Sequence, residues 1–452
     1  MGKSAAKMNR RNFLAGTTAA TAFTIVPRSV LGGTGYGSPS EKLNLAGIGI
    51  GGMGKSDLQH YKNENVLALC DVDWKYAAET FAMFPQARRY KDFRELLSRE
   101  KEIDAVTIGT PDHSHAVIAM AALKAGKHVY CQKPLTHDIY ESRVLAEMAK
   151  KTGLVTQMGI QGHAEEGIRL ICEWIWDGAI GEVRKVEAWC DLTFHPPGHE
   201  WWSTPCTGLP RETPPVPETL DWDLWLGPAA VRPYSPCYLP GIWRNWLAFG
   251  SGMLADRGAH TLDPVFTALK LGYPTSVEAT VTEVSADHFP VASIVTYRFP
   301  AREGMPPVEL TWYDGLRPTT PPDLEPGRQL GSAEGGSLFI GDRGKLMAGV
   351  YGEGARLIPE EKMRAYKTPP KSLPRITGHY DEFIEACKKN TPQQVGAPFS
   401  YSAQLTEIIL LGNIAKRFPK RLLTWDPQQM RFTNHDEANQ LVRTVYREGW
   451  SL

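Results

Sequence analysis

The sequence has no excess of charge, no cysteines paired at metal-binding spacing and no apolar run long enough to cross a membrane. Its 452 residues hold 50 Lys and Arg against 50 Asp and Glu. A neutral chain lacks the basic face that nucleic-acid binding normally requires, and a membrane span needs roughly 18 consecutive apolar residues. The seven cysteines form no CxxC pair, which argues against a structural zinc site, and their odd number in a chain of this size does not imply a disulfide framework. These absences leave a small molecule as the expected partner.

The length and composition predict a globular protein of more than one domain. A chain of 452 residues exceeds the roughly 100–200 residues of an ordinary domain. Apolar residues make up 42% and charged residues 22%, which excludes disordered, collagen-like and coiled-coil classes. We divide the chain into a signal and linker at residues 1–40, a first domain at 41–162 and a second domain at 163–452.

Residues 1–40 have the order of an export signal followed by a linker. They contain no acidic residue, and Arg10 and Arg11 are followed by Phe13, Leu14 and a weakly apolar run over 15–26. This order is typical of a twin-arginine signal, which exports folded proteins. We expect a periplasmic protein that loads its cofactor before export. A disordered basic tail on a cytoplasmic protein is the alternative.

Residues 41–162 alternate between short apolar runs and helical stretches. The apolar runs are 43–48, 66–71, 105–109, 128–131 and 155–158, and the helical stretches are 53–61, 76–84, 93–98, 114–125 and 139–151. Apolar strands that alternate with helices indicate βαβ units around a buried parallel sheet. The first domain is therefore predicted to be an α/β domain of the Rossmann type.

Residues 163–452 predict an α+β domain with a mainly antiparallel open sheet. Strands are expected at 183–194, 277–285, 292–299, 308–312, 337–340 and 345–348, and helices at 165–176, 251–270, 379–389 and 403–417. Between them, residues 194–245 hold eleven prolines and five tryptophans. Proline at that density argues against regular structure, so we expect a long loop packed by its aromatic side chains. Sugar stacking by one of the tryptophans is the alternative.

A glycine-rich turn after the first strand matches a dinucleotide-binding fingerprint. Gly49, Gly51 and Gly54 fit G-x-G-x-x-G, with Gly52 and Met53 inside the turn. Glycine permits the tight turn and the close approach of backbone N–H groups to a pyrophosphate. The helix that follows presents its N-terminus to the phosphates. The turn is therefore predicted to bind the phosphates of a dinucleotide.

An acidic residue stands where such a domain binds the ribose. Asp71 follows Gly51 by 20 residues, at the end of the second predicted strand. A carboxylate there accepts hydrogen bonds from the ribose hydroxyls and repels a 2′-phosphate. NAD is therefore favoured over NADP, with Asp73 as the substitute ribose ligand.

Two further motifs make the sequence recognisable. The stretch 125–131 leads into Gln132-Lys133-Pro134, and a D-x-x-x-H pattern follows at Asp256 and His260. With these motifs the chain resembles the Gfo/Idh/MocA oxidoreductases from about residue 43 to residue 417. The resemblance implies a nicotinamide-dependent oxidation or reduction of a sugar or cyclitol hydroxyl. It also implies that Lys133 lies beside the reacting carbon, that Asp256 and His260 complete the site, and that the protein is a homodimer or homotetramer.

Proton transfer is the chemistry that suits these side chains. Hydride leaves a carbinol carbon only if the hydroxyl proton is removed as well. A lysine whose pKa is lowered by burial and by the nicotinamide cation can take that proton. Asp256 and His260 are four residues apart on a predicted helix, so both can point into one pocket. Either Lys133 or His260 is the acid–base group, and the other orients the hydroxyl.

One position departs from the family pattern. The family usually has Glu where this chain has Gln132, and loss of that negative charge lowers the pKa of Lys133. Polar residues that follow other predicted strands are also expected near the cofactor or the substrate. The expected cofactor contacts are Gly49, Gly51, Gly52, Met53, Gly54, Asp71, Thr110, Pro111, His115, Gln132, Lys133 and Gln161, and the expected substrate contacts are Lys133, His163, Asp256 and His260.

No metal site is expected from the sequence. His195, His199 and Glu200 lie close together and are of metal-binding types. However, the prolines between them prevent the helix that would align them, and the sequence offers no clear third ligand. We therefore interpret this stretch as a loop.

Three functions compete on this sequence. The leading one is an NAD-dependent dehydrogenase for a sugar, glycoside or cyclitol. The alternative is a redox-neutral enzyme in which tightly bound NAD oxidises a sugar carbon, elimination or epimerisation follows, and the hydride returns. Export favours the alternative, since free NAD is scarce outside the cytoplasm. A non-catalytic sugar-binding subunit is the third, and the presence of Lys133, Asp256 and His260 argues against it.

Overall fold

The first of two sheets in the described chain is parallel, as the alternating pattern predicts, and we call the region around it the parallel-sheet half. The computed structural model describes residues 41–195, 202–203 and 208–452, so the predicted twin-arginine signal and the pair His199 and Glu200 lie outside it. The sheet has the strand order β3-β2-β1-β4-β5-β6, and each neighbouring pair is parallel. Its strands are β1 (Asn44–Ile48), β2 (Asn65–Cys70), β3 (Arg88–Tyr90), β4 (Ala105–Ile108), β5 (His128–Gln132) and β6 (Thr156–Gly159).

The strand order reverses at β1, which lies between β2 and β4. In parallel sheets with helices on both faces, ligands bind outside the carboxyl ends of the strands at such a switch point. The crossovers are α3 (Gly52–His60), α4 (Ala78–Met83), α5 (Phe93–Arg99), α6 (Asp112–Lys124) and α7 (Ile139–Thr152). The start of α7 is fixed by a capping box in which Asp138 and Glu141 each accept the other's backbone N–H.

The second half of the chain contains a mixed sheet in the order β13-β12-β11-β7-β10-β9-β8-β14-β15. Strands β7 and β10 pair in parallel, and the other pairs are antiparallel. This confirms the predicted fold class. The strands are β7 (Val183–Cys190), β8 (Ser276–Val281), β9 (Ser293–Phe299), β10 (Val308–Asp314), β11 (Gly335–Gly341), β12 (Gly344–Ala348), β13 (Arg356–Ile358), β14 (Leu423–Asp426) and β15 (Arg431–Phe432).

Helices pack against this sheet and against one another, and among the described residues none is long and apolar enough to cross a membrane. The helix predicted over 251–270 is divided into α10 and α11 at Arg257. In the described part of the expected loop over 194–245 lie the short helix α9 and two 3-10 helices, beside a cluster of buried aromatic rings. The helices are α8 (Glu166–Trp176), α9 (Trp222–Leu226), α10 (Gly252–Asp256), α11 (Gly258–Ala268), α12 (Glu360–Ala365), α13 (His379–Lys389), α14 (Phe399–Arg417) and α15 (Asp436–Asn439).

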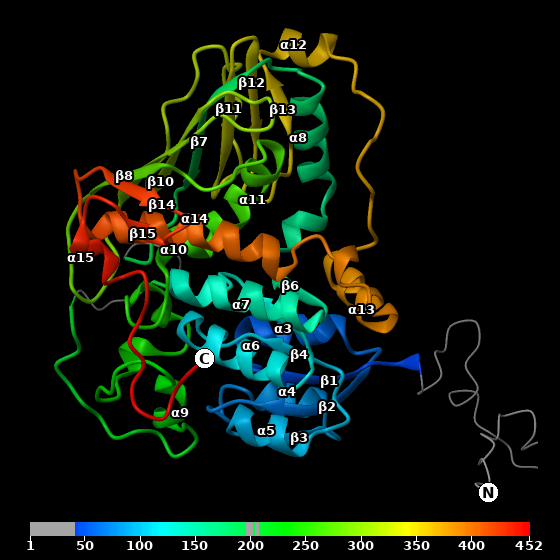
Figure 1. The fold of residues 1–452 in the computed structure, drawn as a ribbon, viewed down its shortest axis with the longest axis vertical. Helices are drawn as coiled ribbons and strands as arrows, with labels where there is room; N and C mark the ends of the chain where they lie inside the picture. The colour runs from blue at the N-terminus through cyan, green and yellow to red at the C-terminus, as the bar shows by residue number, and fades with distance from the viewer. Residues whose placement is uncertain (1–40, 196–201, 204–207) are drawn as a thin grey trace, which may run out of the picture. The chain divides into compact units, whose positions relative to one another are not determined.

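Two late helices complete the core of the parallel-sheet half. Helix α14 lies along α7 (Figure 1), and Arg143 of α7 binds the buried Glu407 of α14 through two nitrogens. Helix α13 contributes Phe383, which is fully buried in one apolar cluster with Leu45 of β1 and Tyr130 of β5. The two sheets therefore share one continuous structure, with α13 and α14 at the junction.

The end of the chain returns to the parallel-sheet half as a strap, which we define as residues 440–452. The backbone N–H of Thr444 donates to Asp138 at 2.7 Å. Arg447 donates to the carbonyl oxygen of Gly227, just after α9, at 2.6 Å and to Asp223 of α9 at 2.6 Å. Because Asp138 precedes α7 and Asp223 belongs to α9, the C-terminal strap fastens α9 to the parallel-sheet half.

Candidate active site

The glycine turn between β1 and α3 leaves no room for side chains. Gly49 has φ +72°, a left-handed conformation that favours glycine. A Cβ on Gly54 would lie 1.9 Å from the carbonyl oxygen of Gly49, and a Cβ on Gly51 would lie 2.1 Å from the ring of Tyr76. Gly51, Gly52 and Met53 all line one cavity. The turn therefore has the close backbone approach that a phosphate-binding cradle requires.

Asp71 lies at the end of β2 and holds this turn in place. Its Oδ2 accepts hydrogen bonds from the backbone N–H groups of Ile50 at 2.9 Å and Gly51 at 3.3 Å, and its Oδ1 accepts one from Asp73 at 2.9 Å. Burial raises the pKa of Asp71 to about 6, although these backbone donors oppose the shift. Asp71 also lines the cavity. It is thus placed to meet a ribose and at the same time braces the loop that would bind the phosphates.

A single cavity runs from this turn to Lys133. Beyond Asp71 it is lined by Phe93 of α5 and by Trp450 of the C-terminal strap, whose ring centroids lie 6.1 Å apart. At the opposite end it reaches Lys133 and Asp256. The cavity therefore joins the predicted dinucleotide-binding residues to the predicted proton-transfer residues.

Lys133 and Asp256 form an ion pair at that end. The Lys133 ammonium donates to the Asp256 carboxylate and, at 2.8 Å, to the Asp256 carbonyl oxygen. Burial lowers the pKa of Lys133, and the neighbouring carboxylate only partly offsets this. Burial opposes ionisation of Asp256, but Lys133 and then Arg244 outweigh it and hold the pKa of Asp256 below its ordinary value. The carboxylate is therefore charged at neutral pH, and it keeps the lysine beside the cavity.

Arg244 adds a second cation that the sequence analysis did not identify. Its Nε lies 3.5 Å from Oδ1 of Asp256, and its guanidinium lies 4.4 Å from the ring centroid of Trp243. Arg244 and Trp243 both line the cavity. Lys133 and Arg244 are therefore two cations around the single carboxylate of Asp256. The planar guanidinium of Arg244 also lies beside the ring of Trp243, where it can donate hydrogen bonds into the cavity.

His260 lies on α11, one turn after Asp256, and it is almost fully buried. Its ring packs on Tyr351 with 4.8 Å between centroids, and its Nδ1 has no hydrogen-bond partner among the described residues. Burial, followed by the charge of Lys133, lowers the pKa of His260, so the imidazole is neutral at neutral pH. The residue does not line the cavity as Lys133 and Asp256 do.

Gln132 lies in a buried hydrogen-bond network that favours an amide at this position. Its Nε2 lies 3.0 Å from Oδ1 and 2.9 Å from Oδ2 of Asp57, a residue of α3 that is fully buried. Tyr380 of α13 donates to the same carboxylate at 2.8 Å. Burial raises the pKa of Asp57 to about 6. Because a glutamate at position 132 would set two carboxylates side by side, the amide is the compatible group here.

Three of the predicted contacts are placed away from the cavity. His115 is buried, with its ring nitrogens 2.8 Å from the carbonyl oxygens of Pro134 and Thr110, and burial lowers its pKa to about 4. Gln161 donates to Tyr380 at 3.0 Å, and Nδ1 of His163 lies 2.8 Å from Oδ1 of Asp263. These three side chains stabilise the wall behind the site instead of lining it.

The remaining predicted contacts, apart from Gly54 and His260, line the cavity, together with residues that no motif indicated. Thr110, Pro111 and Gln132 belong to the first group. Tyr76, which lies against Gly51, and Trp450 belong to the second. Tyr76 and Trp450 come from segments with no diagnostic spacing, so only the folded chain reveals them. For Arg244, the only signal in the sequence was its place in the long Pro- and Trp-rich region.

The cavity fits a dinucleotide on its own geometry. Side chains at Gly51 and Gly54 would fill the cradle, Asp71 stands at the edge of the turn, and one continuous cavity reaches the ion pair. The glycine turn would hold the pyrophosphate, Asp71 would hold a ribose, and Lys133 would lie near the nicotinamide.

Comparison with known proteins gives relatives of one kind. The chain is 29% identical over 154 residues to levoglucosan dehydrogenase from Pseudarthrobacter phenanthrenivorans, a match that covers 32% of this chain and 39% of that protein. It is 29% identical over 147 residues to inositol 2-dehydrogenase from Salmonella typhimurium, with 31% of this chain and 43% of that protein covered. The matches thus span less than half the length of these relatives.

The fold is shared along most of the chain. The crystal structure of an inositol dehydrogenase homolog from Azotobacter vinelandii, complexed with NADH and myo-inositol, aligns with a TM-score of 0.55 at 17% identity. The alignment covers 85% of this chain and 98% of that one.

Two models of one oxidoreductase family match this sequence. The model of the NAD-binding Rossmann fold matches residues 43–160, and the model of the C-terminal alpha/beta domain matches residues 195–302. Together they cover half of the chain, and their order along the sequence is the same as that of the two sheets. The chain therefore belongs to the Gfo/Idh/MocA oxidoreductase family, and its parallel-sheet half is the NAD-binding domain of that family.

Proposed function

We propose that this protein is an NAD-dependent oxidoreductase that acts on a secondary hydroxyl of a sugar, glycoside or cyclitol. The observation that carries the proposal is the ion pair of Lys133 and Asp256, which lines the same cavity as the glycine turn. A cofactor bound along that turn would extend toward this ion pair. The named relatives, levoglucosan and inositol dehydrogenases, support the substrate class.

In this proposal Lys133 and His260 manage the hydroxyl proton, and NAD supplies the hydride acceptor. The Lys133 ammonium donates a hydrogen bond to the carbinol oxygen, and Asp256 keeps that ammonium in place. His260 is neutral, and its Nδ1 is unpartnered within the described chain; because His260 does not line the cavity, it would act on the hydroxyl proton through the neighbouring Lys133 and Asp256. Lys133 can accept the proton instead once its own proton is lost, which its lowered pKa favours. Both assignments keep the base beside Asp256.

Arg244 is proposed to orient the substrate. Its guanidinium is close to Asp256 and lies on the ring of Trp243, which limits its freedom. A planar donor beside an aromatic face suits a polyhydroxylated ring, because hydroxyls accept from the guanidinium while the apolar face of the sugar packs on the indole.

The cofactor and substrate are tested in one sequence of measurements. Purified protein is denatured and its supernatant analysed by mass spectrometry for a co-purifying dinucleotide. The protein is then mixed with NAD or NADP and a panel of sugars, glycosides and cyclitols, and the absorbance of the reduced nicotinamide is followed. NADH formation with at least one of them supports the proposal. The absence of any dinucleotide binding would refute it.

A redox-neutral reaction with tightly bound NAD is the second proposal. The observation that favours it is the C-terminal strap, which places Trp450 in the wall of the cavity and fastens α9 beside it through Arg447. An enclosed cofactor that exchanges slowly suits an enzyme that returns its hydride. Glycoside cleavage or epimerisation without added NAD, and without net NADH, would distinguish this reaction from a dehydrogenase.

Periplasmic localisation by the twin-arginine route is part of the same proposal. Arg10 and Arg11 carry it, and Cys237 supports it, because this cysteine is disulfide-bonded and disulfides persist in oxidising compartments. We further propose a homodimer or homotetramer on the family resemblance. Light scattering of the purified protein measures the mass of the assembly and so tests that assignment.

A further inference from the structure

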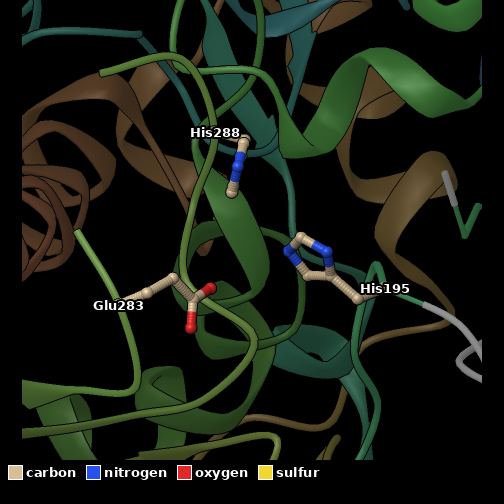
Figure 2. A group of neighbouring side chains, drawn as sticks. All are labelled: His195, Glu283 and His288. Carbon is tan, nitrogen blue, oxygen red and sulfur yellow. The ribbon is translucent and has the colours of Figure 1, made fainter. Parts of the chain in front are cut away.

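Two histidines and a glutamate meet outside the active site. His195 follows β7, whereas Glu283 and His288 lie in the loop between β8 and β9. Figure 2 shows the three side chains converging on one space from these separate segments. One ligand atom from each lies within 4.8 Å of the others. The sequence near His195 offers no clear third ligand, whereas the folded chain brings Glu283 and His288 to it from a distant loop.

The loop backbone orients each of these side chains. The backbone N–H of Val291 donates to Oε1 of Glu283 at 2.7 Å. The carbonyl oxygen of Phe289 lies 3.0 Å from Nδ1 of His288 and 3.1 Å from Nε2 of His195. Metal-binding histidines commonly donate one ring N–H to a backbone carbonyl, which fixes the ring and leaves the other nitrogen as the ligand. The Phe289 carbonyl can serve His288 in this way, whereas Nε2 of His195 lies between that carbonyl and the side-chain amide of Asn245.

The spacing of the cluster suits a metal ion better than it suits direct pairing. Across the described residues, no ion pair joins Glu283 to either histidine or to a lysine or arginine, although its carboxylate lies within 4.8 Å of both imidazoles. Metal–nitrogen and metal–oxygen bonds of about 2.0–2.2 Å place two ligands of one ion at most about 4.4 Å apart. Small movements of three side chains, two of them half-buried, would therefore close the cluster on an ion.

We infer that His195, Glu283 and His288 form a binding site for a divalent transition-metal ion, with zinc as the best match. Two imidazoles and one carboxylate are a ligand set that suits zinc and disfavours calcium or magnesium, which prefer oxygen ligands. Water completes the coordination. The site is independent of the proposed NAD chemistry, because none of the three side chains lines the active-site cavity.

The position of the cluster gives the ion a structural role. His195 marks the start of the proline-rich region, and its Nε2 lies 3.1 Å from the amide nitrogen of Asn245 at the other end of that region. Asn245 directly follows Arg244 of the active site. The ring of Phe289 packs under Gly252, the first residue of α10, where a Cβ would lie 2.8 Å from it. A bound ion would therefore fix both ends of the region that presents Arg244.

The test measures metal binding directly on the full chain. Protein stripped with a chelator is titrated with Zn²⁺ by calorimetry, and its metal content is measured by mass spectrometry after dialysis. We expect one equivalent. His288→Gln and Glu283→Gln should each weaken zinc affinity at least about a hundredfold. Loss of an outer-sphere hydrogen-bond partner already costs up to about that factor, and these variants lose a direct ligand. The matched controls His435→Gln and Glu278→Gln, which alter residues elsewhere in the fold, should bind as the unaltered protein does.

Cobalt substitution adds a readout that does not depend on affinity. Co²⁺ in a four-coordinate site gives intense visible absorption, which His288→Gln should weaken or shift while the circular dichroism of the folded variant stays unchanged. Absence of stoichiometric zinc binding would overturn the proposal. Equal binding by the cluster variants and the controls would overturn it as well, because the ion would then be held elsewhere.

Discussion

Replacing Gln132 with glutamate should make the stability of this protein depend on pH in a new way. In the structure the Gln132 amide nitrogen lies 2.9 Å from Oδ2 of Asp57. A glutamate of the same shape would place a carboxylate oxygen at about that distance. Two unit charges about 3 Å apart repel by about 5 kcal/mol at an effective dielectric constant of about 20. The folded Gln132→Glu variant should therefore keep one proton that its unfolded chain loses.

The size and sign of the effect follow from proton binding. Burial raises the pKa of Asp57 to about 6, so in the wild type this residue is ionised above about pH 7 in both states. The folded variant, by contrast, binds one more proton than its unfolded chain, and stability then falls as pH rises, by about 1.4 kcal/mol per unit. Between about pH 6 and pH 8 the free energy of unfolding should fall by up to about 3 kcal/mol relative to the wild type.

Urea unfolding followed by tryptophan fluorescence measures this difference at several pH values. The matched control is Gln393→Glu, which adds the same charge at an exposed position. The control should follow the wild type throughout. A difference between Gln132→Glu and the wild type that does not change with pH would show that the two carboxylates are not coupled, and the explanation given for glutamine at this position would be wrong.

Other changes test the cofactor site, the proton-transfer site and export. Lys133→Met should leave NAD binding intact and slow single-turnover hydride transfer by about 10²–10⁴-fold, and His260→Ala should have a similar effect; near-normal transfer in Lys133→Met would contradict its role. Asp71→Ala should raise the NAD dissociation constant, measured by calorimetry, at least about tenfold. The variant loses the ribose contacts and the hydrogen bonds that hold the glycine turn. Equal binding of NAD and NADP by the wild type would count against this role. Arg10→Lys combined with Arg11→Lys should retain the protein in the cytoplasm, as fractionation and immunoblotting would show. Normal periplasmic accumulation would mean that the segment is not read as a twin-arginine signal.

The parallel sheet was predictable because its signals are local. β1 and β4 are short runs of mainly apolar, buried residues, and the glycines are required by the turn itself. β3 escaped the prediction because it has only three residues, Arg88, Arg89 and Tyr90, and the first two are exposed. The division of the helix over 251–270 also escaped it, since no helix-breaking residue stands at Arg257.

The candidate site was predictable where its residues belong to motifs and unpredictable where they meet only in the fold. Lys133 and Asp256 are 123 positions apart, and the resemblance alone brought them together. Arg244 and Trp450 carry no spacing signal, because their place in the cavity depends on the path of a proline-rich loop and of the C-terminal strap. His163 was assigned to the substrate because it follows a strand, but tertiary contact with Asp263 determines where its ring points.

The C-terminal strap and α13 bear on the order in which the protein is completed during synthesis. The parallel sheet leaves the ribosome before these two segments, yet Phe383 of α13 packs in its core and Trp450 of the C-terminal strap lines its cavity. Domains made early in a chain generally fold as they emerge. Here the nucleotide-binding half can reach its final packing only after α13 and the C-terminal strap have been made, so a product truncated before α13 would lack part of that core and part of the cavity wall. Assembly of the cofactor site is thereby tied to synthesis of segments far along the chain.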